Sequence, residues 1–170
     1  LGVIKNTCRF IAVDGPHDAK VLESGWVELK MADVEQVEVG DDFYFLDTGS
    51  PHYVAFSPNV QEIDVVQSGR AIRYSERFRA EGTNVNFVQE NGEALIVATY
   101  ERGVEDETLS CGTGVTAAAL AASLKAEQSG AEVQEGQKDI QAKGGQLQVK
   151  FQRTASGFEE IWLCGPATQV

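Results

Sequence analysis

Residues 115–124 form an apolar stretch that carries no charge on any face until Lys125. Its alanines and leucines favour a helix. A helix that is apolar all round is normally buried on every side, and this one is shorter than the about 20 apolar residues of a membrane span. We therefore expect a central helix whose amino terminus must open into a cleft if the residues there meet a ligand.

Most other patterned segments read as short strands. We expect strands at residues 8–15, 19–22, 26–31, 43–47, 53–56, 83–88, 95–100, 140–143, 146–152 and 158–164, and a partly helical segment at 60–74. The turn signal at residues 14–16 makes the first three strands an antiparallel meander, and the glycine pair at 144–145 predicts a hairpin. Residues 32–40 have a weak, acidic pattern and are predicted to be a boundary, while residues 132–137 are predicted to be loop or sheet edge. The fold class is α+β, with a β-barrel-like, curled mixed sheet wrapped around a central hydrophobic helix.

Composition narrows the classes of partner. The 170 residues suffice for one domain with a real core, and 14 basic against 26 acidic residues give a net charge of −12. This charge argues against nucleic acid and anionic membranes, so a small polar substrate fits better. No segment resembles a signal peptide or a membrane span. The cysteines Cys8, Cys111 and Cys164 fit neither a disulfide framework nor a zinc site, and we expect a cytoplasmic protein.

Cys111 is the strongest candidate for a chemically reactive residue. It lies in the turn Ser110-Cys111-Gly112-Thr113-Gly114, between a charged loop and the start of the apolar helix. The free N–H groups of a first helical turn should lower the pKa of the thiol and hold a carboxylate. The glycines allow close approach to the backbone. The alternative is a small buried thiol that caps a tight turn.

Two charged residues precede this turn. Glu101 and Arg102 stand side by side after a predicted strand, and such a pair can clasp the ammonium and carboxylate groups of an amino acid. An exposed ion pair would use the same two residues. The pair becomes a stronger candidate for substrate binding only because Cys111 follows it closely in the sequence.

Polar residues in two further segments are candidate ligand contacts. His52 follows Ser50 and Pro51 in a tight turn between strands, where it could bind a polar ligand or bond a nearby carbonyl. Asn84 and Asn86 alternate with apolar residues, so they share one face of a strand. Paired amides could bind a carboxylate or an amine, although hydrogen bonds at a sheet edge are their commoner use.

The chain resembles the diaminopimelate epimerase family. The resemblance is carried by Tyr100-Glu101-Arg102-Gly103 followed by Glu107-Thr108-Leu109-Ser110-Cys111-Gly112-Thr113-Gly114. It extends to Gly49-Ser50-Pro51-His52, Thr83-Asn84-Val85-Asn86-Phe87, Gly144-Gly145 and Leu163-Cys164-Gly165-Pro166-Ala167, in order and over nearly the whole chain. The family has two domains, each a β-barrel around a central helix, which agrees with the fold expected above.

The resemblance implies an isomerase that interconverts LL- and meso-diaminopimelate in lysine and peptidoglycan precursor synthesis. It implies no cofactor, neither pyridoxal phosphate nor a metal. Two cysteines act on opposite faces of the substrate, and the second of them falls on Cys111. The implied catalytic residues are Cys111, Glu101 and His52, and the implied substrate-binding residues are Ser50, Asn84, Glu101, Arg102, Gly112 and Thr113. Ser50 stands where many members of the family carry asparagine.

The resemblance also implies that part of the enzyme is absent. The first cysteine of the family lies in a glycine-rich segment of the N-terminal domain, and Cys8 lacks those glycines and lies in a strand pattern. We expect residues 1–35 to be the terminal strands of the N-terminal epimerase domain and residues 36–170 to be the C-terminal domain. Alone, the chain is expected to be inactive until the missing N-terminal domain is supplied. Pairing with a second copy as a homodimer is left open.

Two alternatives remain at this point. A proline racemase or hydroxyproline epimerase shares the fold type and a Cys-Gly-Thr-Gly segment, but the lead-in at residues 100–103 and the turn at residues 49–52 favour diaminopimelate epimerase. From a different class, the chain could be a noncatalytic binding domain whose cysteine is structural.

Overall fold

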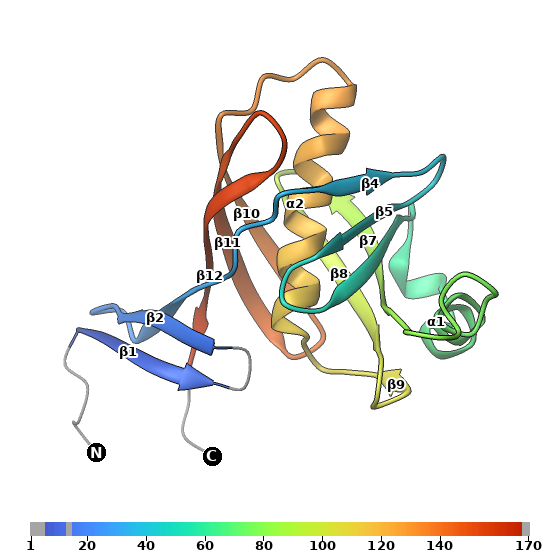
Figure 1. The fold of residues 1–170 in the computed structure, drawn as a ribbon, viewed down its shortest axis with the longest axis horizontal. Helices are drawn as coiled ribbons and strands as arrows, with labels where there is room; N and C mark the ends of the chain where they lie inside the picture. Colours follow the sequence, from blue (N-terminus) through green and yellow to red (C-terminus); the bar gives the residue numbers. More distant parts are fainter. Residues whose placement is uncertain (1–5, 13–14, 168–170) are drawn as a thin grey trace.

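The structure, a computed structural model, describes residues 6–12 and 15–167 (Figure 1). Its strands are β1 (Thr7–Ala12), β2 (Gly15–Val21), β3 (Trp26–Lys30), β4 (Val37–Val39), β5 (Tyr44–Asp47), β6 (Pro51–Phe56), β7 (Asn84–Asn91), β8 (Ala94–Glu101), β9 (Asp106–Glu107), β10 (Glu135–Ala142), β11 (Gly145–Arg153) and β12 (Phe158–Pro166). Its helices are the 3-10 helix η1 (Val60–Glu62), α1 (Val65–Arg73) and α2 (Gly112–Gln128).

The strands belong to one open, mixed sheet. Their order is β1-β2-β3-β12-β11-β10-β8-β7-β6-β5-β4, with β9 paired to β8 beside this path. The pairs β6–β7 and β8–β10 are parallel, and the other pairs are antiparallel. Figure 1 shows the sheet curling around α2, with β4 to β6 on one side of the helix and β10 to β12 on another. The predicted α+β fold with a curled mixed sheet around a helix is confirmed.

Helix α2 is buried along most of its length, as its sequence predicted. Every residue from Gly114 to Ser123 is buried, and the helix contacts seven strands from both arms of the sheet. Since no face of this segment meets water, its alanines and Leu120 complete the main core. The strands contribute Leu46, Val54, Val88, Leu95, Ile140, Val149 and Ile161 to the same core.

A second apolar cluster lies where α1 packs on β7 and β8. It contains Val65 of α1 and Tyr100 of β8, both buried. A Cβ atom on Gly69 would lie 2.4 Å from Cβ of Tyr100, so only glycine lets the helix approach the strand this closely. Helix α1 therefore packs against the end of β8, where the loop that leads to Cys111 begins.

The structure differs from the expected element boundaries in three places. Strand β10 begins at Glu135, within the segment expected to be loop or edge, because its backbone pairs with β11 from Glu135↔Gln152 onward although half of its residues are exposed. The segment 32–40 contains β4, which pairs with β5, and a bridge from Val34 to Phe158. Gly15 and Pro16, expected in the first turn, are the start of β2, because they pair with the end of β1.

The order of pairing in the predicted meander and hairpin is confirmed by the β1–β2–β3 and β10–β11 pairings, although Asp14 lies outside the described residues.

None of the helices in the described ranges combines the length and the apolar composition that crossing a membrane requires.

Candidate active site

Cys111 is the N-cap residue of α2 and lines a pocket of about 430 Å³. The residue is 9% exposed. The pocket is formed by Glu101 and the start of α2 together with apolar and aromatic side chains from other strands. The lining residues are Phe10, His17, Leu29, Met31, Glu101, Ser110, Cys111, Gly112, Thr113 and Leu163. The helix start therefore borders a pocket, which is the condition under which Cys111 could meet a ligand.

The Thr113 hydroxyl lies 3.4 Å from the sulfur of Cys111, although the side chain makes no capping hydrogen bond to the helix backbone. The hydroxyl and the nearby backbone N–H groups of Thr113 and Gly114 each lower the pKa of the thiol. These donors favour a thiolate. Burial nevertheless raises the pKa of the Cys111 thiol, and the negative charge of Glu101 adds to the increase. The expected lowering of this pKa is therefore wrong for the chain as it stands, because removal of water outweighs the helix amides.

The first turn of α2 fits closely against β7. A Cβ atom on Gly114 would lie 2.5 Å from Oδ1 of Asn86 and 3.2 Å from Cβ of Cys111. Only a glycine at this position allows the helix start to approach the polar side chains of the strand. Thr48 reinforces the contact from the β5–β6 turn, since its hydroxyl donates to the Thr113 carbonyl at 2.8 Å.

His52 lies directly behind Thr113 and is fully buried. Its Nε2 is 2.8 Å from Oγ1 of Thr113 and 3.0 Å from Oγ of Ser50, and its Nδ1 is 3.0 Å from Nδ2 of Asn86. The pKa of His52 is lowered to about 3, chiefly by burial and to a smaller extent by the positive charge of Arg102. The ring is therefore neutral at physiological pH.

Asn84 links the two segments that carry predicted site residues. Its Nδ2 donates to Oγ of Ser50 at 3.0 Å and to the Pro51 carbonyl at 3.1 Å, and its Oδ1 accepts from the Arg102 N–H at 2.9 Å. The Arg102 guanidinium donates to the Glu81 carbonyl at 2.8 Å. The side chains of the predicted pair therefore point in different directions. Glu101 lines the pocket, whereas the Arg102 side chain bonds to the segment just before β7.

The loop between β8 and Cys111 is held by one carboxylate. Glu105 accepts from the hydroxyls of Tyr100 at 2.8 Å and Tyr74 at 2.9 Å, and from the Gly103 N–H at 3.1 Å. The Gly103 N–H and the two hydroxyls lower the pKa of Glu105, so it is ionised at neutral pH. These bonds fix the loop that positions Cys111.

The sequence pattern paired Asn84 with Asn86, but the family resemblance gave a site role to Asn84 alone. The structure connects Asn86 to His52 and to Thr99, whose hydroxyl donates to its Oδ1 at 2.9 Å. The signal was present, since the alternation along β7 already put both asparagines on one face. The pattern could not show which strand lies beside β7. His52 reaches Asn86 only because β6 pairs with β7 in parallel.

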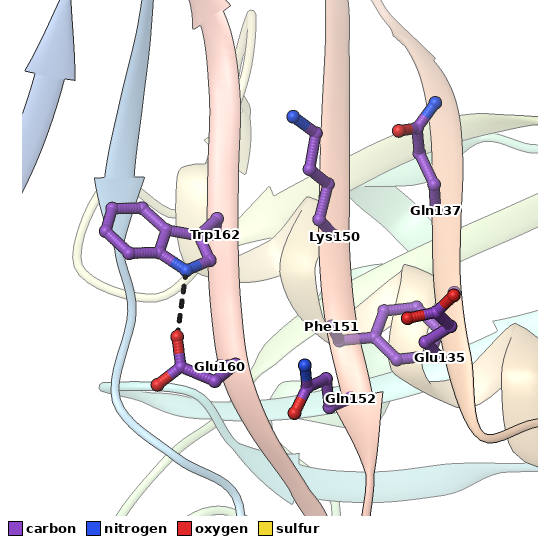
Figure 2. Close-up of a pocket in the computed structure, with 8 residues that line it drawn as sticks. Glu135, Gln137, Lys150, Phe151, Gln152, Glu160 and Trp162 are labelled. Atoms are coloured by element: carbon purple, nitrogen blue, oxygen red, sulfur yellow. Dashed lines mark hydrogen bonds between the residues drawn. The ribbon is translucent and has the colours of Figure 1, made fainter.

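A larger hollow lies on the face of β10, β11 and β12 (Figure 2), with a volume of about 480 Å³. Two of its charged side chains already have partners: Lys150 bonds Glu28 at 2.6 Å, and Glu160 bonds Lys30 at 2.9 Å. Figure 2 shows Trp162 leaning over Glu160, to which its Nε1 donates at 3.3 Å. None of the predicted site residues lines this hollow, so the pocket at Cys111 is the candidate active site.

Comparison with known proteins identifies the family of the chain. The model of the family described as Diaminopimelate epimerase matches residues 44–170. A diaminopimelate epimerase of Flavobacterium psychrophilum is 44% identical over 168 residues, which is 98% of this chain and 64% of the relative. One of Chlorobaculum tepidum is 37% identical over 169 residues, 95% of this chain and 63% of the relative. The chain thus spans slightly less than two thirds of either relative.

A solved structure shows the same fold. The crystal structure of a hydroxyproline epimerase from Agrobacterium vitis, with bound trans-4-hydroxy-L-proline, has a TM-score of 0.70 and covers 96% of this chain and 57% of its own. Its sequence identity is 15%. At that identity, the likeness concerns the fold alone.

Proposed function

Because the chain belongs to the diaminopimelate epimerase family, we propose that Cys111 is one of the two acid–base groups of a cofactor-independent epimerase acting on diaminopimelate. The observation that carries this proposal is the position of its sulfur. Cys111 is the N-cap residue of the central helix, its sulfur lies 3.4 Å from the Thr113 hydroxyl, and it lines a pocket shared with Glu101. A merely structural thiol needs none of these features.

The reaction exchanges a proton at the α-carbon. Burial raises the pKa of Cys111, so the residue rests as a thiol and can donate its proton to one face of the substrate carbanion. The carbanion electron pair forms the new C–H bond, and the sulfur is left as a thiolate. The N–H groups of Thr113 and Gly114 and the Thr113 hydroxyl stabilise that thiolate. In the reverse direction, the same thiolate takes the α-proton.

The substrate would be oriented by groups beside the sulfur. Glu101 lines the pocket and is placed to accept the substrate ammonium, while the N–H at Gly112 lies at the positive end of α2 and suits the α-carboxylate. Arg102 would exchange the Glu81 carbonyl for a carboxylate of the substrate. Ser50, His52 and Asn84 act behind this layer, where their hydrogen bonds hold Thr113 and Arg102.

The second acid–base group must approach the opposite face of the α-carbon. We place it in the part of the relatives that this chain does not match. Phe10 and His17 of the meander already form the wall facing Cys111. We accordingly assign residues 1–35 to the last strands of the domain that carries the second group, and residues 36–170 to the domain that carries Cys111.

The proposal is tested with a chimera that joins this chain to the unmatched part of the Flavobacterium psychrophilum relative. We expect it to interconvert LL- and meso-diaminopimelate, and Cys111→Ser to reduce the rate about a thousandfold, since positioned acid–base groups contribute of that order. Cys8→Ser is the matched control and should leave the rate unchanged. Faster conversion of trans-4-hydroxy-L-proline than of diaminopimelate, or an active Cys111→Ser variant, would refute the assignment.

A further inference from the structure

The side chain of Asn86 is completely buried behind the pocket, and its orientation is fixed. Its Nδ2 lies 3.1 Å from the carbonyl oxygen of Tyr53, which can only accept a hydrogen bond. The nitrogen must therefore face Tyr53, and Oδ1 accepts from the Thr99 hydroxyl at 2.9 Å. The second hydrogen of Nδ2 points to Nδ1 of His52 at 3.0 Å.

This bond determines which ring nitrogen of His52 carries the hydrogen. Since Nδ1 accepts from Asn86, the neutral ring must carry its hydrogen on Nε2. Nε2–H then donates to Thr113 Oγ1, its nearest polar neighbour at 2.8 Å. His52 in this state has no free nitrogen with which to take a proton from Cys111.

The direction of donation continues through Thr113. Its oxygen accepts from His52, so its own hydrogen is available for Oγ of Ser50 at 3.2 Å or for Sγ of Cys111 at 3.4 Å. Ser50 already accepts from Nδ2 of Asn84. A thiolate is a stronger acceptor than a hydroxyl oxygen, so the hydrogen turns to the sulfur whenever Cys111 is ionised.

We propose that Asn86 is a positioning residue, which fixes the Nε2–H form of His52 and thereby directs the Thr113 hydroxyl to the thiolate of Cys111. No proton leaves its atom in this arrangement, since each group donates a hydrogen bond to the next. The inference deepens the proposed role of Cys111 and rests on it. Both readouts below concern this chain without substrate, so they can fail while the epimerase assignment stands.

The first test measures the tautomer of His52 by nitrogen-15 NMR of the unaltered chain labelled at histidine. The chain has two histidines, so His17→Gln assigns the signals. We expect a neutral ring protonated at Nε2 throughout pH 6 to 8. A ring protonated at Nδ1, or a ring that is charged at pH 6, would overturn the proposal.

The second test follows alkylation of Cys111 by iodoacetamide, resolved from Cys8 and Cys164 by peptide mass spectrometry. Only the thiolate reacts, so the rate at fixed pH reports its stabilisation. Thr113→Val should lower the rate at pH 8 about tenfold, the worth of one hydrogen bond to a charged group. Thr116→Val is the matched control, because that hydroxyl bonds the Gly112 carbonyl instead. Equal rates for the two variants would contradict the proposal.

A double-mutant cycle then separates positioning from a general structural effect. Asn86→Leu should slow alkylation about as much as Thr113→Val does, and it should have no further effect in the Thr113→Val background. Fully additive losses would refute a path through Thr113. Glu101 and His17 line the same pocket, and Arg102 acts on His52. Because these groups are the same in every variant, their effects cancel when the alkylation rates of Cys111 are compared. If circular dichroism shows that Asn86→Leu does not fold, the tautomer measurement and the comparison of Thr113→Val with Thr116→Val still test the proposal.

Discussion

At the scale of residues, Cys111 is governed by opposing influences, of which burial is the largest. Burial and the charge of Glu101 favour the thiol, whereas two backbone amides and the Thr113 hydroxyl favour the thiolate. The thiol can act as an acid, and the groups that favour the thiolate reduce the cost of ionisation when the residue acts as a base. An epimerase that works in both directions needs both forms of the residue.

The contribution of Glu101 can be measured directly. Glu101→Gln removes a negative charge beside the sulfur, so the pKa of Cys111 should fall and alkylation of this residue at pH 7.5 should become about threefold faster, as expected for a partly solvated charge pair. Glu93→Gln, at an exposed turn, is the control. A rate that is unchanged or lower in Glu101→Gln would mean that this carboxylate does not act on the sulfur.

His52 should make the stability of the chain depend on pH. Its pKa is near 6.5 when unfolded and about 3 when folded, so the unfolded chain binds the extra proton between these values and stability falls as the pH falls. From pH 7 to pH 5, the free energy of unfolding should decrease by about 2 kcal/mol from this residue alone. Urea titrations at both pH values measure the decrease.

The same titrations on two variants supply the controls. His52→Gln should lose most of this pH dependence, and His17→Gln should retain it. Carboxylates with lowered pKa, such as Glu28 and Glu105, lose their contribution mainly below their ordinary value of 4.5, outside this window. An identical pH dependence in all three proteins would show that His52 is not buried in its neutral form.

At the scale of elements, the site depends on how closely α2 approaches β7. Gly114→Ala would place a methyl group 2.5 Å from Oδ1 of Asn86, so we expect a loss of about 1–3 kcal/mol in the free energy of unfolding and slower alkylation of Cys111. Ser123→Ala, farther along α2, is the control. The Ser123 hydroxyl is buried without a hydrogen-bond partner among the described residues, so its removal should be neutral or stabilising. The reverse order of stabilities, measured by thermal unfolding, would contradict the packing.

The elements themselves were largely readable from the sequence, because apolar periodicity is a local signal. The central helix, the meander, the glycine hairpin and Cys111 at the helix start were all predicted and are confirmed. The raised pKa of Cys111 was not predictable, since burial depends on how distant segments pack, and the pocket that Cys111 lines also includes Phe10, Leu29 and Leu163 from other strands. The direction of the Arg102 side chain depends likewise on a carbonyl 21 residues away in the chain.

At the scale of the whole molecule, one continuous sheet carries both walls of the pocket. Strands β1 to β3 join β12, so the meander with Phe10 and His17 faces the start of α2. The sheet is open, and Cys111 is the one thiol among the described residues that line the pocket. Two-sided proton exchange needs a group on the other side of the substrate, so we expect the 170-residue chain alone to show no epimerase activity.

The central claim, that the sulfur of Cys111 exchanges a proton with the α-carbon, is tested most directly by deuterium incorporation. The chimera is incubated in D₂O with LL- or meso-diaminopimelate, and deuterium at the α-carbon is followed by mass spectrometry. We predict that both isomers take up deuterium with the unaltered protein. With Cys111→Ala, uptake should cease for the isomer whose α-hydrogen faces residue 111. Uptake from both isomers at the unaltered rates would contradict the account.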